Sequence, residues 1–294
     1  MSKWVFIFFL LTFSSTVFSQ NKRYETASGA VHIWGEMQKG ALLKAPYSEW
    51  YEASIKGYKP NSSLIKNKRA LSKMDVTIYL GTWCGDSKNY VPKFFSLWQS
   101  LNLSEKNIKI IGLHGSRDHY KQGPNGEEKG AHIHRVPTFI FSKDGEEVGR
   151  IVERPINSLE MDVAQIAAGI PSLPRYQAVS YMIDFYDNYE IEQFDSEYDN
   201  IIHDIGRLNN GVSELNTYGI VLQLSGRLQR AQQIFKINNE LYPFEPKSYY
   251  SLGVSHMKME EWEDAQKCFI EVLKIDPEHK RVVKKLYDTN EKIK

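Results

Sequence analysis

Residues 75–87 of this chain read DVTIYLGTWCGDS. The first six of these residues form a short, mostly apolar pattern that is typical of a β-strand, and Gly81 bounds it. A helical pattern then runs from about residue 85 to residue 101, so Cys84 lies where a strand turns into a helix. The unpaired N–H groups and the partial positive charge of a helix N-terminus stabilise an anion there, including a thiolate. We therefore expect Cys84 to be a nucleophile near neutral pH.

Trp83 precedes this cysteine, and Pro92 follows it by eight residues. The resulting Trp-Cys-Gly-x-x…Pro pattern resembles the active-site turn of the thioredoxin superfamily, whose first active-site helix also carries such a proline. Most dithiol members have a second cysteine where this chain has Ser87, and a buried acid where it has Ile78. The resemblance therefore implies catalysis through Cys84 alone, with the Ser87 hydroxyl donating a hydrogen bond to the thiolate. Such a site depends on an external thiol or shuffles the disulfides of its substrate.

A second proline, Pro137, stands just before an apolar strand pattern at residues 138–142. In thioredoxin-like proteins a cis-proline at this point faces the active cysteine and offers backbone hydrogen bonds to an extended peptide, and the resemblance implies the same here. Asp86 would disfavour the thiolate if its charge lay near the sulfur, and Lys88 would offset that effect. The residues that we expect to bind the substrate are Trp83, Gly85, Asp86, Val136 and Pro137.

The first half of the chain alternates between strand and helix patterns. Strands are expected at about residues 31–36, 75–81, 108–113, 138–142 and 147–152, and helices near residues 47–56, 61–73, 85–101 and 158–169. Asp144-Gly145 is a strong hairpin signal between the last two strands, and a polar loop at residues 115–130 turns at residues 123–126. The order matches the thioredoxin fold, an α/β domain in which helices flank a central mixed sheet. Five aromatic residues of its N-terminal extension are expected to pack rather than to bind a ligand: Trp34, Tyr47, Trp50, Tyr51 and Tyr58.

After residue 169 the pattern becomes almost entirely helical, and it repeats every 34 residues. Six pairs of residues share this spacing: Leu215/Tyr249, Tyr218/Leu252, Gly219/Gly253, Ala231/Ala265, Phe235/Phe269 and Pro243/Pro277. The spacing and the residue set resemble tetratricopeptide repeats, in which glycine and alanine lie where paired helices approach closely. We expect an all-α domain with clear repeats at residues 212–245 and 246–279, and extra or capping helices at residues 176–208 and 281–293. Its helices would bind a protein or peptide partner.

The N-terminus has the pattern of a signal peptide. Lys3 supplies positive charge, residues 4–13 are apolar, and Val17-Phe18-Ser19 is a small-residue cleavage site before Gln20. The apolar run is well short of the ~20 residues that span a bilayer, so no membrane span is expected after cleavage. We expect a periplasmic or secreted protein; the alternative is a buried first helix or an uncleaved anchor. The expected organisation is a signal peptide at 1–19, a thioredoxin-like domain at 20–170, a linker at 171–177 and a helical repeat domain at 178–294.

Composition excludes several classes of partner and site. The 37 Lys and Arg residues against 36 Asp and Glu residues give a formal net charge of +1, so no nucleic-acid partner is expected. There are two cysteines, which exclude a framework of several disulfides, and we expect Cys268 to be buried in a repeat helix. Four histidines fall within 21 residues: His114, His119, His132 and His134. One thioredoxin-like branch handles copper with cysteine and histidine, but it uses two cysteines, and histidines in a polar loop are usually solvated. No metal or cofactor is therefore predicted.

The resemblance implies an exported thiol-disulfide oxidoreductase or isomerase-like protein. It would act on protein thiols and disulfides through one nucleophilic cysteine, while the repeats bind a protein partner. The alternative is a non-catalytic module in which the thioredoxin groove and the repeat surface simply bind proteins. Fast alkylation of the thiol at neutral pH would favour the enzyme, and a sluggish reaction the binding module.

Overall fold

The computed structural model describes residues 22–293. The expected signal peptide at residues 1–19, and its cleavage site between Ser19 and Gln20, lie outside the described residues. Within residues 22–293, no helix combines the length and the apolar character needed to cross a membrane.

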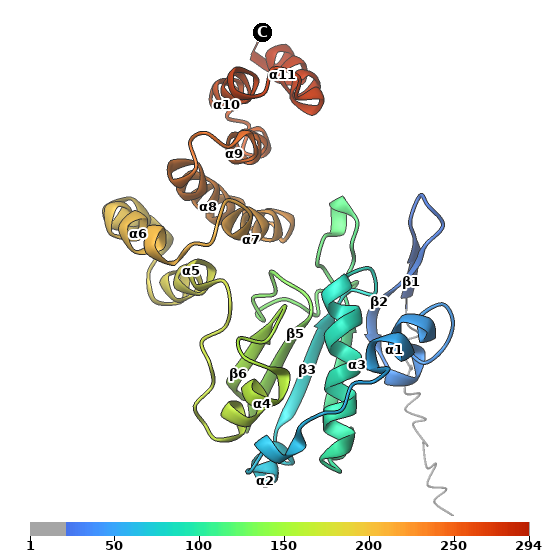
Figure 1. Ribbon diagram of the computed structural model, residues 1–294. Helices are drawn as coiled ribbons and strands as arrows, with labels where there is room; N and C mark the ends of the chain where they lie inside the picture. The colour runs from blue at the N-terminus through green and yellow to red at the C-terminus, as the bar shows by residue number, and fades with distance from the viewer. Residues whose placement is uncertain (1–21, 294) are drawn as a thin grey trace, which may run out of the picture.

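A six-stranded mixed sheet forms the first half of the protein (Figure 1). Its strands are β1 (Lys22–Glu25), β2 (Val31–Met37), β3 (Asp75–Leu80), β4 (Ile108–Gly112), β5 (Thr138–Lys143) and β6 (Glu146–Val152). They lie in the order β1-β2-β4-β3-β5-β6, and β3 and β4 are the parallel pair. The mixed sheet is as predicted from the sequence. Strand β1 is not predicted, because its four residues are polar and pair only with β2 at the edge of the sheet.

Short connections and helices flank this sheet. The helices are α1 (Ser48–Ile55), α2 (Lys68–Leu71), α3 (Gly85–Ser100) and α4 (Leu159–Ala167), and the 3₁₀ turns are η1 (Lys39–Ala41), η2 (Ser62–Leu64) and η3 (Arg117–His119). The helix predicted at residues 61–73 is wrong, since the segment holds only η2 and the single turn α2. Asn67 breaks it: its side chain caps α2 by accepting the N–H of Ala70 at 3.2 Å and donates to the carbonyl of Ala167 at 3.0 Å.

The alternation of side chains on β3 divides the core into two layers. Val76, Ile78 and Leu80 face α1, α3 and α4 in the main core. Tyr79 faces the opposite side, where it packs with residues of the long connection between β4 and β5, residues 113–137. This period of two is what a strand buried on both faces requires. Ile78 is fully buried in the main core.

The hairpin between β5 and β6 follows the predicted turn. Asp144 and Gly145 both have positive φ, of 54° and 88°. Positive φ at both central residues is the requirement of a two-residue type I′ turn. The turn sets the pairing of Lys143 with Glu146.

The second half of the protein is an arc of helices above the sheet (Figure 1). Its elements are α5 (Gln177–Asn188), the turn η4 (Ile191–Gln193), α6 (Phe194–Leu208), α7 (Ser213–Leu224), α8 (Leu228–Leu241), α9 (Pro246–Lys258), α10 (Trp262–Ile275) and α11 (Lys280–Ile293). The residues with a 34-residue spacing lie where helices meet. A Cβ at Gly219 would stand 2.5 Å from the ring of Phe235, and one at Gly253 would stand 2.7 Å from the ring of Phe269. The helical, repeat-containing second half is therefore as predicted.

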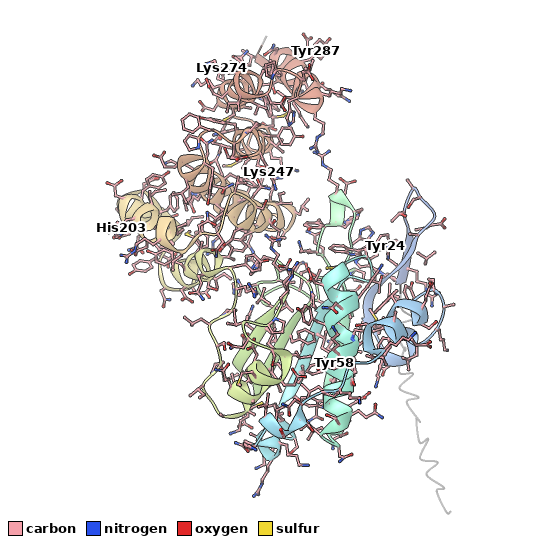
Figure 2. All side chains as sticks on the ribbon, viewed as in Figure 1. Tyr24, Tyr58, His203, Lys247, Lys274 and Tyr287 are labelled. Carbon is pink, nitrogen blue, oxygen red and sulfur yellow. The ribbon has the colours of Figure 1, made fainter. Side chains whose placement is uncertain are left out.

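The connection at residues 113–137 lies between the sheet and the helical arc. The hydroxyl of Tyr24, which Figure 2 labels, accepts the N–H of Gly115 at 2.7 Å and anchors the start of the connection to β1. On the other side, the Arg117 guanidinium donates to the hydroxyl of Tyr250 in α9 at 3.2 Å. Gly126 N–H donates to the carbonyl of Gly123 at 3.3 Å, so the predicted turn is present within it. The connection thus touches both halves of the molecule.

Candidate functional site

Cys84 is the N-cap residue of α3 and has an extended backbone conformation. Its side chain is partly exposed and packs against the second core layer. The thiol donates a hydrogen bond to the carbonyl oxygen of Val136 at 3.1 Å. The strand-to-helix turn therefore brings the sulfur directly against the segment that precedes Pro137.

The peptide bond between Val136 and Pro137 is cis, as the resemblance implied. The carbonyl of Pro137 accepts the N–H of Glu153 at 2.7 Å. The carbonyls of Val136 and Pro137 are thus already paired, the first with the Cys84 thiol and the second with Glu153, just after β6. Cys84, Val136 and Pro137 lie together, although 52 residues separate the cysteine from the valine.

Trp83 forms a rigid wall next to the cysteine. Its indole N–H donates to the carbonyl of Leu113 at 2.9 Å. The ring fits between two glycines, because a Cβ at Gly81 or Gly115 would stand 2.5 or 2.8 Å from it. The ring of Tyr120 lies 5.7 Å away, centre to centre. Packing from both sides therefore fixes the indole beside the sulfur.

The turn residues after the cysteine have different surroundings from those expected. Ser87 is fully buried, and its hydroxyl accepts the N–H of Gly81 at 3.2 Å. The hydrogen bonds found among residues 22–293 do not join this hydroxyl to the Cys84 sulfur. Asp86 forms an ion pair with Arg154 at 2.9 Å. Gly85 opens α3, and a Cβ there would meet nothing within 4 Å. Ser87 thus ties the helix to β3, and the Asp86 charge is directed at Arg154.

Sequence reasoning missed a group of charged and aromatic residues around the cysteine. They are Tyr120, Lys121, Arg135, Glu153 and Tyr176. Only 2% of Lys121 is exposed, and this burial lowers its pKa to about 7. The position of Arg135, two residues before Pro137, is a signal that could have pointed to it. The other four are brought together only by the folding of distant segments.

Arg135 links this site to the helical arc. Its guanidinium donates to the carbonyl of Ser213 at 3.0 Å, at the start of α7, and lies 3.7 Å from the carboxylate of Glu153. It also lies 4.5 Å from the ring centre of Tyr176. The Tyr176 hydroxyl donates a hydrogen bond to the Glu153 carboxylate. A continuous set of contacts, which we call the Arg135 joint (Arg135, Glu153, Tyr176 and Ser213), thus runs from Pro137 to the first repeat helix.

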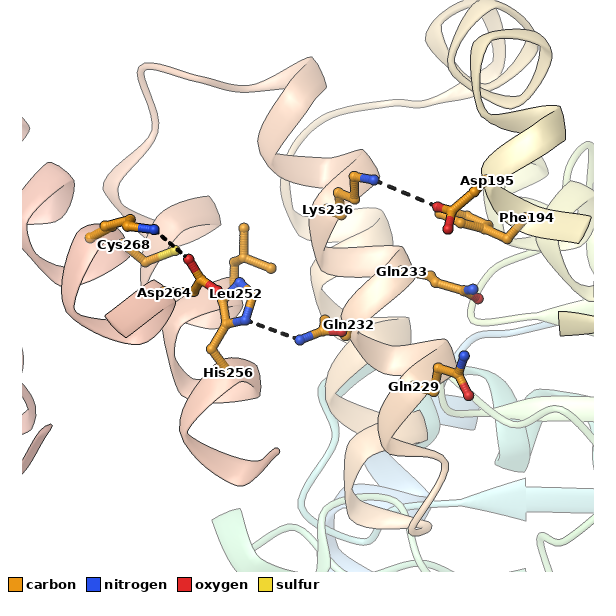
Figure 3. Close-up of a pocket in the computed structure, with 11 residues that line it drawn as sticks. Phe194, Asp195, Gln229, Gln232, Gln233, Lys236, Leu252, His256, Asp264 and Cys268 are labelled. Carbon is orange, nitrogen blue, oxygen red and sulfur yellow. Dashed lines mark hydrogen bonds and ion pairs between the residues drawn. The ribbon is translucent and has the colours of Figure 1, made fainter. Parts of the chain in front are cut away.

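The second cysteine has a different environment. Cys268, in α10, is 8% exposed, and burial raises the pKa of its thiol to about 12. It lies in the wall of a cavity of about 470 Å³ with Leu252, His256 and Asp264 (Figure 3). A thiol with such a pKa is almost wholly protonated at neutral pH and is a poor nucleophile.

The four clustered histidines pack against neighbours. His114 stacks on Tyr24 with 3.5 Å between ring centres, and His119 lies 5.3 Å from His114. His132 and His134 line a separate cavity of about 350 Å³ beside β6 and α5. Among the described residues, no group of three or more His, Cys, Asp or Glu side chains is arranged to hold a metal ion.

Comparisons with known proteins find a repeat family and two thioredoxins. A family model of the tetratricopeptide repeat matches residues 246–279. Over 103 residues, 35% of the chain, it is 28% identical to thioredoxin H9 of Arabidopsis thaliana, and the match covers 66% of that protein. Over 100 residues, 34% of the chain, it is 29% identical to the TPR repeat-containing thioredoxin TDX of the same plant, and covers 24% of it. The chain thus matches less than two thirds of the length of each relative.

Proposed function

Since the chain joins a thioredoxin-like domain to tetratricopeptide repeats, we propose that it exchanges thiols and disulfides on proteins through Cys84 alone. The observation that carries the proposal is the position of the sulfur: partly exposed, at the N-terminus of α3, and 3.1 Å from the carbonyl that precedes cis-Pro137. Cys268 is buried, and its thiol has a raised pKa. Cys84 is therefore the cysteine suited to nucleophilic attack.

The proposed reaction is a monothiol exchange. The Cys84 thiolate attacks one sulfur of a substrate disulfide, forms a mixed disulfide and releases the other sulfur as a thiolate. Ser87 cannot resolve this intermediate, so an external thiol or a second substrate thiol attacks it and frees Cys84. The apolar Ile78, fully buried in the main core, fits a protein that lacks the resolving step of a dithiol enzyme.

Incubation of the full chain with a peptide that contains one disulfide tests this function. We expect mass spectrometry to find a mixed disulfide on Cys84, and expect a small external thiol to release it. Cys84→Ser should abolish the adduct, whereas Cys268→Ser, the matched control, should leave its rate unchanged. An adduct on Cys268, or none at all, contradicts the proposal.

A second candidate is a binding module without turnover. The observation in its favour is the hydrogen bond that the Cys84 thiol donates to the Val136 carbonyl, because a thiolate cannot make this bond. The rate of iodoacetamide alkylation at neutral pH separates the candidates. A rate no faster than that of an unfolded cysteine peptide supports the binding module.

The repeats are proposed to bind a protein partner, as such helical arrays commonly do. Export to the periplasm or the medium is proposed from Lys3, the apolar run and the cleavage pattern at residues 17–19. N-terminal sequencing of the protein recovered from its own host should begin at or near Gln20. An intact Met1 in a cytosolic fraction contradicts export.

A further inference from the structure

Lys121 is a buried lysine close to the proposed nucleophile. Its side chain is 2% exposed, and its ammonium lies 3.7 Å from the ring centre of Tyr120. That ring lies 5.7 Å from the ring of Trp83, which immediately precedes Cys84. A lysine side chain is almost never fully buried unless it is paired. The position therefore calls for a partner that compensates the charge.

The backbone at Lys121 has a conformation that is uncommon for a residue with a side chain. Its φ is 59°, in the left-handed region that is uncommon for residues other than glycine. The N–H of Lys121 donates to the carbonyl of His114 at 2.8 Å, and the N–H of His114 donates to the carbonyl of Gln122 at 3.1 Å. Two hydrogen bonds thus hold this strained residue in place. Strain of this kind is concentrated at functional sites.

The charged groups that face Lys121 come from three elements. Arg135, before Pro137, disfavours the ammonium, whereas Glu153, after β6, and a Cys84 thiolate, at the start of α3, favour it. Burial lowers the pKa of His134, and the Lys121 charge lowers it further. Glu153 is already engaged in the Arg135 joint. The ion pairs formed among residues 22–293 give Lys121 no carboxylate partner within 4.0 Å. Cys84 is therefore the anion that remains for it.

We propose that the Lys121 ammonium is the electrostatic partner of Cys84 and stabilises its thiolate. This inference rests on the function proposed above and deepens it. Lys121 is a positioning residue, because it acts on the substrate through Cys84. It supplies, from the connection at residues 113–137, a charge that the apolar Ile78 on the central strand cannot provide.

The proton and the electrons balance at each step. The S–H bond of Cys84 breaks and its proton passes to water, while the Lys121 ammonium keeps its charge and stabilises the thiolate that remains. The thiolate forms a bond to one sulfur of the substrate disulfide while the old S–S bond breaks, and the departing sulfur keeps the electron pair. The departing thiolate then takes up a proton from water. An external thiol later loses its proton to water and attacks the substrate sulfur of the mixed disulfide. A new disulfide forms, and Cys84 departs with the electron pair as a thiolate that Lys121 again stabilises.

The test is the pH profile of Cys84 alkylation by iodoacetamide in the full chain carrying Cys268→Ser. Lys121→Met removes the charge and keeps the length of the side chain. We expect the midpoint of its profile to rise by about one pH unit and the rate at pH 7 to fall ~tenfold. Lys121→Arg keeps the charge and should keep the parental midpoint. The matched control is Lys129→Met, which removes an exposed lysine charge from the same connection and should change neither value.

Two results overturn the inference: a Lys121→Met profile that superimposes on the parental one, or a Lys121→Arg profile that shifts as far as the Met variant. Thermal unfolding verifies that each variant is folded, and Lys121→Gln supplies the same charge change if the Met variant does not fold. Failure of the proposed function gives a different pattern. In that case the parental chain forms no adduct with the disulfide peptide, whatever the lysine variants do to alkylation.

Discussion

At position 87 a fully buried hydroxyl accepts the N–H of Gly81 at 3.2 Å. Ser87→Cys tests the geometry of this turn, because it creates a pair of cysteines at the spacing that dithiol thioredoxins use. We predict that the variant forms an 84–87 disulfide on oxidation and gains insulin-reduction activity with a chemical reductant, while the parent shows little. Activity stays modest because Ile78 leaves the buried acid missing. Mass spectrometry of the oxidised variant and a turbidity assay measure the two effects.

The control for this change is Ser87→Ala. It removes the acceptor of a buried N–H and should destabilise the protein by ~1–3 kcal/mol without any gain in turnover. The cysteine variant keeps a weak acceptor and should lose only ~1 kcal/mol. If Ser87→Cys neither closes a disulfide nor gains turnover, the turn is not built like that of a dithiol enzyme.

The lowered pKa of His134 allows a prediction of how the stability of the protein depends on pH. Its imidazole is buried, and this burial lowers its pKa to about 3, whereas the unfolded chain has the ordinary value of about 6.5. Below pH 6.5 the unfolded state binds a proton that the folded state excludes, so stability falls as the pH drops from 6.5 toward 3. The slope from this residue is ~1.4 kcal/mol per pH unit.

Urea unfolding between pH 7 and pH 4 measures that slope. His134→Gln should reduce the slope by about that amount and leave stability above pH 7 independent of pH at this position. His203→Gln, at an exposed position of α6, is the control and should keep the parental slope. Equal slopes for the parent and His134→Gln would contradict the prediction.

The residues of the site could be predicted only in part. The places of Trp83 and Cys84 at a strand-to-helix turn and of Pro137 before a strand follow from local patterns in the sequence. The cis form of the Val136–Pro137 bond was expected only from the family resemblance. Lys121 and Glu153 are not visible in this way, because their burial depends on how a long polar connection folds back over the sheet. The hydrogen bond expected from Ser87 to the thiolate rested on residue type alone. The observed role of the Ser87 hydroxyl, as the acceptor of the Gly81 N–H, depends on the position of Gly81 in the fold.

Among the elements, the repeat helices give a sharp test of close packing. A Cβ at Gly219 or Gly253 would lie 2.5 or 2.7 Å from the buried ring of Phe235 or Phe269. We predict that Gly219→Ala and Gly253→Ala each destabilise the protein by ~1–3 kcal/mol, as overpacking does. Gly206→Ala is the matched control in helix α6, where the nearest atom would lie at 3.6 Å.

At Gly206 there is space, so the higher helix propensity of alanine should make the change neutral or stabilising by up to ~1 kcal/mol. Chemical denaturation followed by circular dichroism compares the three variants. Equal stability of all three would mean that the helices of each repeat are not packed as tightly as described.

The elements themselves were predictable where one strong pattern decides them. The hairpin at Asp144-Gly145 and the 34-residue period belong to this class, because turn geometry and helix packing each demand particular residues. The helix expected at residues 61–73 fails because Asn67 bonds to the end of α4, a contact between distant segments that outweighs local helix propensity. Strand β1 is recognisable only from its pairing with β2.

For the whole molecule, the Arg135 joint is one of the sets of contacts that hold the two halves together. Arg135→Met removes the hydrogen bond to Ser213 and the ion pair to Glu153. We predict that trypsin then cleaves after Arg175, in the segment between α4 and α5, ~tenfold faster, because a loss of about 1.4 kcal/mol raises the open population by that factor. Gel electrophoresis over a time course measures the cleavage.

Arg117→Met is the matched control. It removes an exposed hydrogen bond between the same two halves, to Tyr250, and should change the cleavage rate less than ~twofold, because exposed contacts stabilise little. Identical cleavage rates for Arg135→Met and the parent would show that other contacts hold the halves together.

The Arg135 joint holds α7 against the segment that leads to cis-Pro137. It therefore fixes the distance between the repeats and the Cys84 sulfur. A partner docked on the helices would then present only those disulfides that lie at one set distance from its docking segment. Two partners with the same docking sequence but differently spaced disulfides would therefore be distinguished by the distance between docking segment and disulfide. No further contact at the cysteine would be needed.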